Sequence, residues 1–142
     1  MSDKPRVQVL LCDGAMVVNR KWTLQGVFDR INSYKGFPVT PEPFVIYFRI
    51  NDLVIQNGSK IVVEIRRSVL EDMEGQTQSV FRGALDFNIS GGGREKIGPT
   101  TFDFGMPVKG VTFTDPGVYD VLFLVENALI DVWTLNVVHA QR

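Results

Sequence analysis

The chain has 142 residues, a formal net charge of −1, and hydrophobic and charged fractions of 44% and 22%, as in an ordinary soluble globular protein. We expect a single domain over residues 1–142, because a chain of this size can bury roughly 68–70% of its unfolded surface without metal or disulfide support. Nucleic-acid binding normally requires a stripe of lysines and arginines, which this sequence lacks, so we expect no nucleic-acid partner.

The first residues show no pattern of export or membrane insertion. The apolar run from Val7 to Leu11 is interrupted by Gln8 and is short beside the about 7–15 apolar residues of a signal peptide. No stretch approaches the roughly 20 apolar residues of a transmembrane helix. A single cysteine, Cys12, excludes an internal disulfide. These features predict a cytoplasmic protein that does not bind membranes.

The first two predicted strands form a hairpin. Apolar residues alternate over 7–11, the polar segment Asn19-Arg20-Lys21 turns the chain, and a second alternating run follows over 22–28. Gly26 lacks a side chain in the middle of the returning strand, which indicates a bulge or the close approach of a neighbouring segment.

Three more strands are predicted in the middle of the chain, over 44–50, 59–66 and 79–89. Between the first two, Asn57-Gly58 is the usual signal of a tight hairpin. After the third, the glycines at 91–93 indicate a loop that continues to residue 99.

The last two strands are predicted over 118–125 and 129–138, after a turn at Asp115-Pro116-Gly117 and on either side of residues 126–128. No helical periodicity or crossover helix is present, which argues against a parallel sheet. The sequence therefore predicts an all-β fold, an antiparallel β-sandwich of about eight or nine strands of Ig-like or C2-like type, with a β-barrel as the alternative.

The strand over 118–125 is apolar on both faces. Val118, Leu122 and Leu124 lie opposite the residues that would face the core, and Asp120 is the polar exception. A second apolar face must be covered by a long loop or by another molecule. We therefore expect a homo-oligomer, or a complex with another protein.

Catalytic residue types are scarce. Cys12 could act as a nucleophile only with a base, and the one histidine, His139, lies at the end of the last strand. Free cysteine more often packs in a core, so we expect no enzyme. One cysteine and one histidine cannot form a zinc site. The acidic segment 71–74 lacks the spacing of a calcium loop, and no helix follows the glycines at 91–93 to bind phosphate, so we expect no cofactor.

The candidate interaction surface consists of Tyr34, Lys35, Phe37, Arg66 and Arg67. Tyr34 and Phe37 fall in a connection where burial is not forced, and exposed aromatics beside a lysine suit a protein or sugar surface. Alternatively, both aromatics cap one end of the sandwich. Arg66 and Arg67 break the alternation of their strand, which indicates an edge position kept polar against aggregation.

Several segments together resemble a family of short uncharacterised bacterial proteins. They are Leu11-Cys12-Asp13, Lys21 to Leu24, Gly26-Val27-Phe28-Asp29-Arg30-Ile31, the proline-rich step from Phe37-Pro38 to Pro43-Phe44, and the closing part from Pro116-Gly117-Val118-Tyr119 to Val137-Val138. The resemblance implies a β-sandwich of bacterial or phage origin and supplies no catalytic residues. We expect a non-enzymatic assembly module that acts through its surface, or alternatively a sandwich that binds a small molecule or carbohydrate near Tyr34 and Phe37.

Overall fold

The computed structural model describes residues 6–56, 60–68, 79–86 and 96–141, and its regular elements are all strands. The strands are β1 (Arg6–Val18), β2 (Lys21–Phe28), β3 (Arg30–Ser33), β4 (Phe44–Gln56), β5 (Lys60–Arg67), β6 (Ser79–Asp86), β7 (Lys96–Val108), β8 (Gly117–Val125) and β9 (Ala128–His139). Within these residues, no helix is long and apolar enough to span a membrane.

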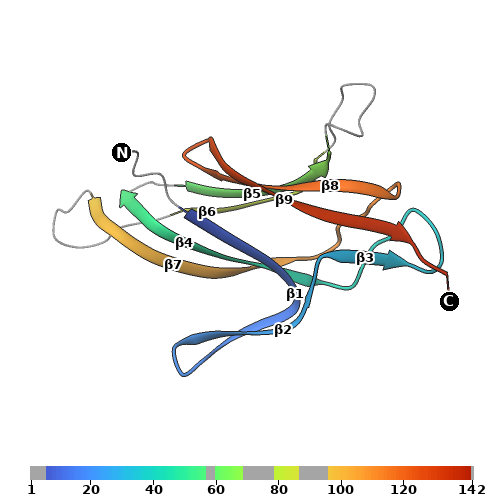
Figure 1. The fold of residues 1–142 in the computed structure, drawn as a ribbon, viewed down its shortest axis with the longest axis horizontal. Helices are drawn as coiled ribbons and strands as arrows, with labels where there is room; N and C mark the ends of the chain where they lie inside the picture. Colours follow the sequence, from blue (N-terminus) through green and yellow to red (C-terminus); the bar gives the residue numbers. More distant parts are fainter. Residues whose placement is uncertain (1–5, 57–59, 69–78, 87–95, 142) are drawn as a thin grey trace.

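The strands form two sheets that lie one above the other (Figure 1). The four-stranded sheet has the order β2-β1-β4-β7, and the five-stranded sheet has the order β3-β9-β8-β5-β6. Alternate residues of both sheets point inward and form one buried core, as the period-two patterns require. The predicted β-sandwich is therefore confirmed.

Aromatic rings join the two sheets at the centre of this core. Phe48 of β4 is fully buried, and its ring lies 4.9 Å from that of Phe123 on β8 of the opposite sheet. Phe102 and Phe104 of β7 lie 6.3 and 6.0 Å from Phe48 on its own sheet. These separations are in the range at which aromatic pairs attract beyond their burial.

Two hairpin turns have the conformation that strand twist favours. Asn19 and Arg20 connect β1 to β2 with φ of 51° and 63°, and Glu126 and Asn127 connect β8 to β9 with φ of 53° and 65°. Two successive positive φ angles define the type I′ turn of two-residue hairpins. The first connection was predicted as a polar turn and the second as the junction of two strands, and both are confirmed.

The end of the β1–β2 hairpin extends past the rest of its sheet. Beyond Cys12, β1 pairs with β2 alone, because its register with β4 ends at that residue. The hairpin is held by Trp22, whose ring lies 6.1 Å from the ring of Tyr47 on β4. Trp22 also covers Gly105 of β7, where an added Cβ would stand 2.9 Å from the indole. Figure 1 shows the resulting projection below β4 and β7.

Tyr47, against which Trp22 packs, is itself held by a hydrogen bond that titration can test. Its hydroxyl donates a 2.8 Å hydrogen bond to Asp103, and burial, followed by that hydrogen bond, raises the pKa of Tyr47 to about 12. The folded-state pKa lies above the unfolded value of about 10. The contribution of Tyr47 to the stability of the fold is therefore fully present below about pH 10 and is lost as the pH rises through about 12. In ultraviolet difference titrations, Asp103→Asn is expected to lower this pKa. An unchanged pKa in that variant would contradict the assigned hydrogen bond.

Two expectations about the middle of the chain are wrong. β4 and β5 belong to different sheets, so the connection between them crosses the sandwich and is no hairpin; residues 57–59 themselves lie outside the described residues. The expected loop up to residue 99 ends earlier, because β7 begins at Lys96 and includes Pro99. Proline is tolerated there because β7 is an edge strand, where a missing N–H breaks no ladder on the free side. The glycines at 91–93 and the acidic segment 71–74 lie outside the described residues.

One strand pair departs from the antiparallel pattern. β3 follows β2 after Asp29 and enters the opposite sheet, where it runs parallel to the last residues of β9. A chain that changes sheets without turning back keeps its direction, so β3 meets β9 in parallel. The crossing from β2 to β3 defines the side of the sandwich described next.

Candidate interaction site

The crossing at Asp29 leaves two strand edges without a partner among the described residues. β2 pairs with β1 only from Leu11 onward, so the edge of β1 over residues 6–10 has no β2 residues beside it. β3 pairs with β9 only over residues 136–139, so the edge of β9 over 128–135 is open in the same way. Unpaired strand edges carry free N–H and C=O groups and are templates for pairing with another chain.

An open groove with a volume of about 690 Å³ lies between these edges. Three of its apolar side chains are well exposed, Leu10 at 43%, Val27 at 57% and Val132 at 41%. Trp133 is partly buried and also lines the groove, while its indole N–H is buried and has no acceptor among the described residues. The groove is lined by Val9, Leu10, Leu11, Val27, Phe28, Asp29, Val132, Trp133 and Thr134.

A smaller pocket of about 310 Å³ lies next to the groove and shares Val27 and Phe28 with it. Its lining includes Asp13, Arg30 and Glu42, so it is charged where the groove is apolar. Residues 26–31 contribute to both hollows, with Gly26, Arg30 and Ile31 in the pocket and Asp29 in the groove.

Gly26 is fixed by its neighbour Asp13. Its φ is +67°, a left-handed conformation that favours glycine, and an added Cβ would stand 2.2 Å from the Asp13 carboxylate. The predicted close approach at Gly26 is therefore confirmed, and the approaching group is a side chain of the paired strand.

Cys12 and His139 lie in different sheets and in different environments. Cys12 of β1 is fully buried, and burial, with a smaller effect of the neighbouring Asp13, raises the pKa of its thiol. A raised pKa disfavours the thiolate that a nucleophile needs. His139 is exposed at the end of β9, and its ring meets the edge of Phe37 at 6.4 Å. Among the described residues, no group of three or more histidine, cysteine or acidic side chains could hold a metal ion.

The predicted interaction residues of the loop after β3 differ in their exposure to solvent. Tyr34 is 50% exposed and Lys35 is exposed, so both face solvent. Phe37 is partly buried and packs against the main core, as the capping alternative predicted for it. Ser33, which is buried, donates a hydrogen bond from its hydroxyl to the carbonyl of Gly36 and so fixes the loop between them.

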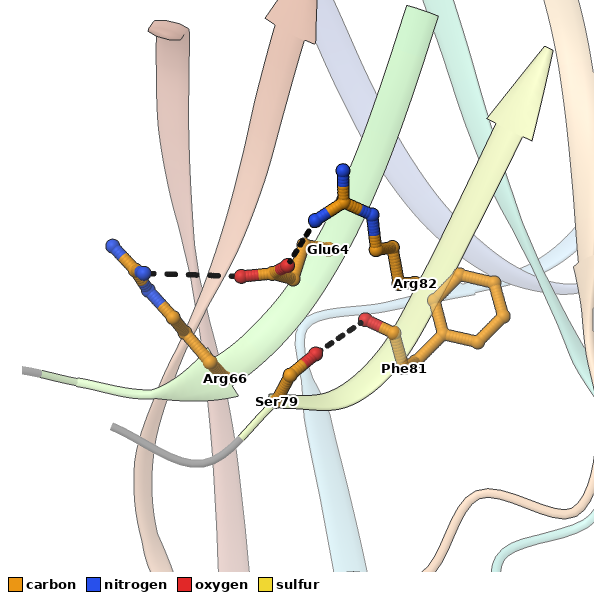
Figure 2. A network of polar contacts seen from close by, with 5 residues as sticks. All are labelled: Glu64, Arg66, Ser79, Phe81 and Arg82. Atoms are coloured by element: carbon orange, nitrogen blue, oxygen red, sulfur yellow. Dashed lines mark hydrogen bonds and ion pairs between the residues drawn. The ribbon is translucent and has the colours of Figure 1, made fainter. Parts of the chain in front are cut away.

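Arg66 takes part in a polar network on the outer face of the five-stranded sheet (Figure 2). The carboxylate of Glu64, whose side chain is only 14% exposed, lies 3.8 Å from Arg66 and 3.5 Å from Arg82. The largely buried carboxylate of Glu64 on β5 is therefore compensated by two guanidinium groups, one from β5 and one from β6. β5 lies between β8 and β6, so the expectation that Arg66 and Arg67 mark a sheet edge is wrong.

Arg67 holds the turn before β8. Its guanidinium lies 3.5 Å from the Asp115 carboxylate, donates to the carbonyl of Pro116 at 3.3 Å, and stands 5.9 Å from the centre of the Tyr119 ring. The Tyr119 hydroxyl donates to the carbonyl of Asp115 at 2.8 Å, an arrangement like the tyrosine corner of immunoglobulin-type sandwiches. These contacts give Arg67 a structural role in this turn.

The predicted surface residues therefore form two groups, because β8 and β9 lie between β5 and β3 in the sheet. The apolar outer face of β8 is also partly covered within one chain, since Leu122 and its neighbour Val62 are only 5% and 2% exposed and lie outside the main core. The groove was not predicted from the sequence. A signal that could have found it is Leu10, an apolar residue that falls on the outward face of an alternating strand and is 43% exposed.

Over the residues that the structure describes, the fold and the groove define a β-sandwich of nine strands with an open side. A family of unknown function, DUF6941, matches residues 8–138, and the chain belongs to this family. The expected membership of an uncharacterised family is thereby confirmed. None of the curated proteins matches the sequence.

Solved structures of much larger proteins share part of the chain path. A β-glucosidase from Listeria innocua in complex with gluconolactone aligns with 96% of this chain and 16% of its own, at 8% identity and a TM-score of 0.45. A β-D-glucoside glucohydrolase from Trichoderma reesei aligns with 94% of this chain and 18% of its own, at 9% identity and a TM-score of 0.42. This chain spans less than a fifth of either protein, and no activity is carried over from them.

Proposed function

We propose that this protein is a non-enzymatic assembly module that self-associates through the groove between β1 and β9. The observation that carries the proposal is the combination, at one place, of two unpaired strand edges and three exposed apolar side chains, Leu10, Val27 and Val132. Removing such apolar surface from water stabilises a complex by about 25 cal/mol per Å².

The open edges add hydrogen bonds to this apolar surface. A polypeptide lying along β1 or β9 would pair its backbone with N–H and C=O groups that have no strand beside them among the described residues, and alternate side chains would enter the groove. On β9, the Val132 N–H already donates to the Asp131 carboxylate at 2.8 Å. A small polar ligand gains less from such a site, because most of the lining side chains are apolar. The proposed partner is therefore a polypeptide.

Other features support a role without catalysis. The raised pKa of Cys12 opposes a thiolate nucleophile, and His139 contacts Phe37 at the exposed end of β9. Binding of a small molecule or carbohydrate is the alternative, with Tyr34 as the remaining solvent-facing aromatic of the predicted loop.

Light scattering over a range of protein concentrations tests the proposal. The wild-type chain is expected to reach at least the mass of a dimer, because burial of the groove removes apolar surface from water. Val27→Lys is expected to return the protein to a monomer, since it places an unpaired charge among apolar contacts. Val27 is 57% exposed, so this change leaves the core intact.

Ala84→Lys is the matched control, because Ala84 is exposed on β6 at the far edge of the five-stranded sheet. It adds the same charge away from the groove and is expected to leave the mass unchanged. A wild-type monomer at every concentration would contradict self-association and favour the small-molecule alternative. An equal loss of mass in both variants would contradict the assignment to the groove.

A further inference from the structure

Three further exposed apolar side chains lie together on another part of the molecule. Met16, Val17 and Val18 are 52%, 57% and 44% exposed, and all three lie on the projecting end of the β1–β2 hairpin. The chain therefore presents an apolar projection and an apolar groove. Surfaces of this kind on a soluble protein mark interaction sites.

We infer that the projecting hairpin of one copy, residues 14–25, occupies the groove of a second copy. This inference rests on the proposed function and names the occupant of the groove. Within its own chain, the end of the hairpin lies against Tyr47 and Gly105 through Trp22, which pairs with Val17 in the register.

Charge complementarity supports this occupant. The turn of the hairpin carries Arg20 and Lys21, both exposed, and the charged residue in the groove lining is Asp29, also exposed. A hairpin entering with Met16 and Val18, which share one face of β1, against the apolar lining brings a basic turn toward Asp29. Opposite charges at the rim of an interface favour encounter and set orientation.

The backbone of the hairpin supplies a second match. β2 is the outer strand of its sheet, so one of its edges has no strand beside it among the described residues. The edges of β1 over 6–10 and of β9 over 128–135 are unpaired in the same sense. An edge of one copy placed beside an edge of the other would satisfy groups on both.

Charge exchange tests the inference. Asp29→Lys alone and the pair Arg20→Asp with Lys21→Glu alone are each expected to raise the dissociation constant of self-association about tenfold or more, because like charges then face each other. Aspartate is chosen at position 20 because Arg20 has a φ of 63°, which aspartate tolerates. Combining all three substitutions in one chain is expected to restore the wild-type constant to within about threefold.

Two further variants serve as controls. Asp86→Lys on β6 and Lys109→Glu after β7 reverse single charges of the same signs at exposed positions outside the hairpin, the groove and the loop after β3. Restoration in the triple variant, with both controls unchanged, supports the inference. If Val27→Lys abolishes self-association but the charge variants have no effect, the groove is used and the hairpin is not its occupant, which overturns the inference alone. A wild-type monomer would overturn the inference and the proposed function together.

Discussion

Replacing Phe48 with alanine is expected to lower the free energy of unfolding by about 3–5 kcal/mol. Phe48 is fully buried, and its ring contacts aromatic rings of both sheets, at 4.9 Å from Phe123 and 6.0 Å from Phe104. Two contributions make up the loss. The removed ring no longer supplies the free energy gained by burying it, and a cavity remains where the two sheets cannot close together. For a domain of this size, such a loss is a large part of the total stability.

Urea unfolding measures this loss as a shift of the midpoint at constant slope. Phe48→Leu is the matched control, because it keeps an apolar side chain at the same place and is expected to lose less than half as much. If alanine cost no more than leucine, the ring of Phe48 would not join the sheets, and the assigned core would be wrong.

Burial of the inward-facing strand residues and the positions of two hairpin turns could be predicted from the sequence. Phe48 and Phe123 lie in apolar runs that were predicted as strands, and the inward-facing residues of such runs must be buried wherever strands form layers. The polar pairs at residues 19–20 and 126–127 tolerate positive φ, so the positions of two hairpins followed from local chemistry. These strands and turns depend on neighbouring residues, which a sequence displays directly, whereas β3 and β7 were not predicted.

The pairing of strands across longer distances was not predictable in the same way. Asn57-Gly58 has the residues of a tight turn, yet β4 and β5 enter different sheets, because each buries its apolar face against the other layer. Pro99 similarly suggests a loop, but it is accommodated by the free edge of β7. Both errors arise because local turn propensity is weaker than the packing of the sheets.

The candidate site depends on such a long-range feature. Nothing in the chemistry of Phe28, Asp29 and Arg30 shows that the chain changes sheets there, and the groove exists only because it does. Arg66 and Arg67 looked available for a partner in sequence, but Glu64 and Asp115 lie within ion-pair distance of them. The order of the strands in the two sheets decides which residues share a surface, and this order is known only from the assembled structure.

Replacing Gly26 with alanine is expected to lower the free energy of unfolding by about 2–4 kcal/mol. Two effects contribute. The φ of +67° strains any residue with a Cβ, by about 1–2 kcal/mol. The new Cβ also meets the Asp13 side chain, at 2.2 Å from Oδ2 and 2.7 Å from Cγ, so the carboxylate must move. Because Asp13 lines the smaller pocket, its displacement also alters the shape of that pocket.

A double-mutant cycle with Asp13→Ala separates these two effects. Asp13→Ala removes the two closest atoms and keeps the Asp13 Cβ, 3.0 Å from the added Cβ, so it relieves most of the close contact and leaves the strain of the backbone. The double variant is therefore expected to be more stable than the sum of the single changes predicts, by about 1–2 kcal/mol. A coupling near zero would mean that Asp13 moves away without cost, and that backbone conformation alone requires glycine at this position. A coupling of the expected size would show that the contact between β1 and β2 helps to fix the segment that lines both hollows.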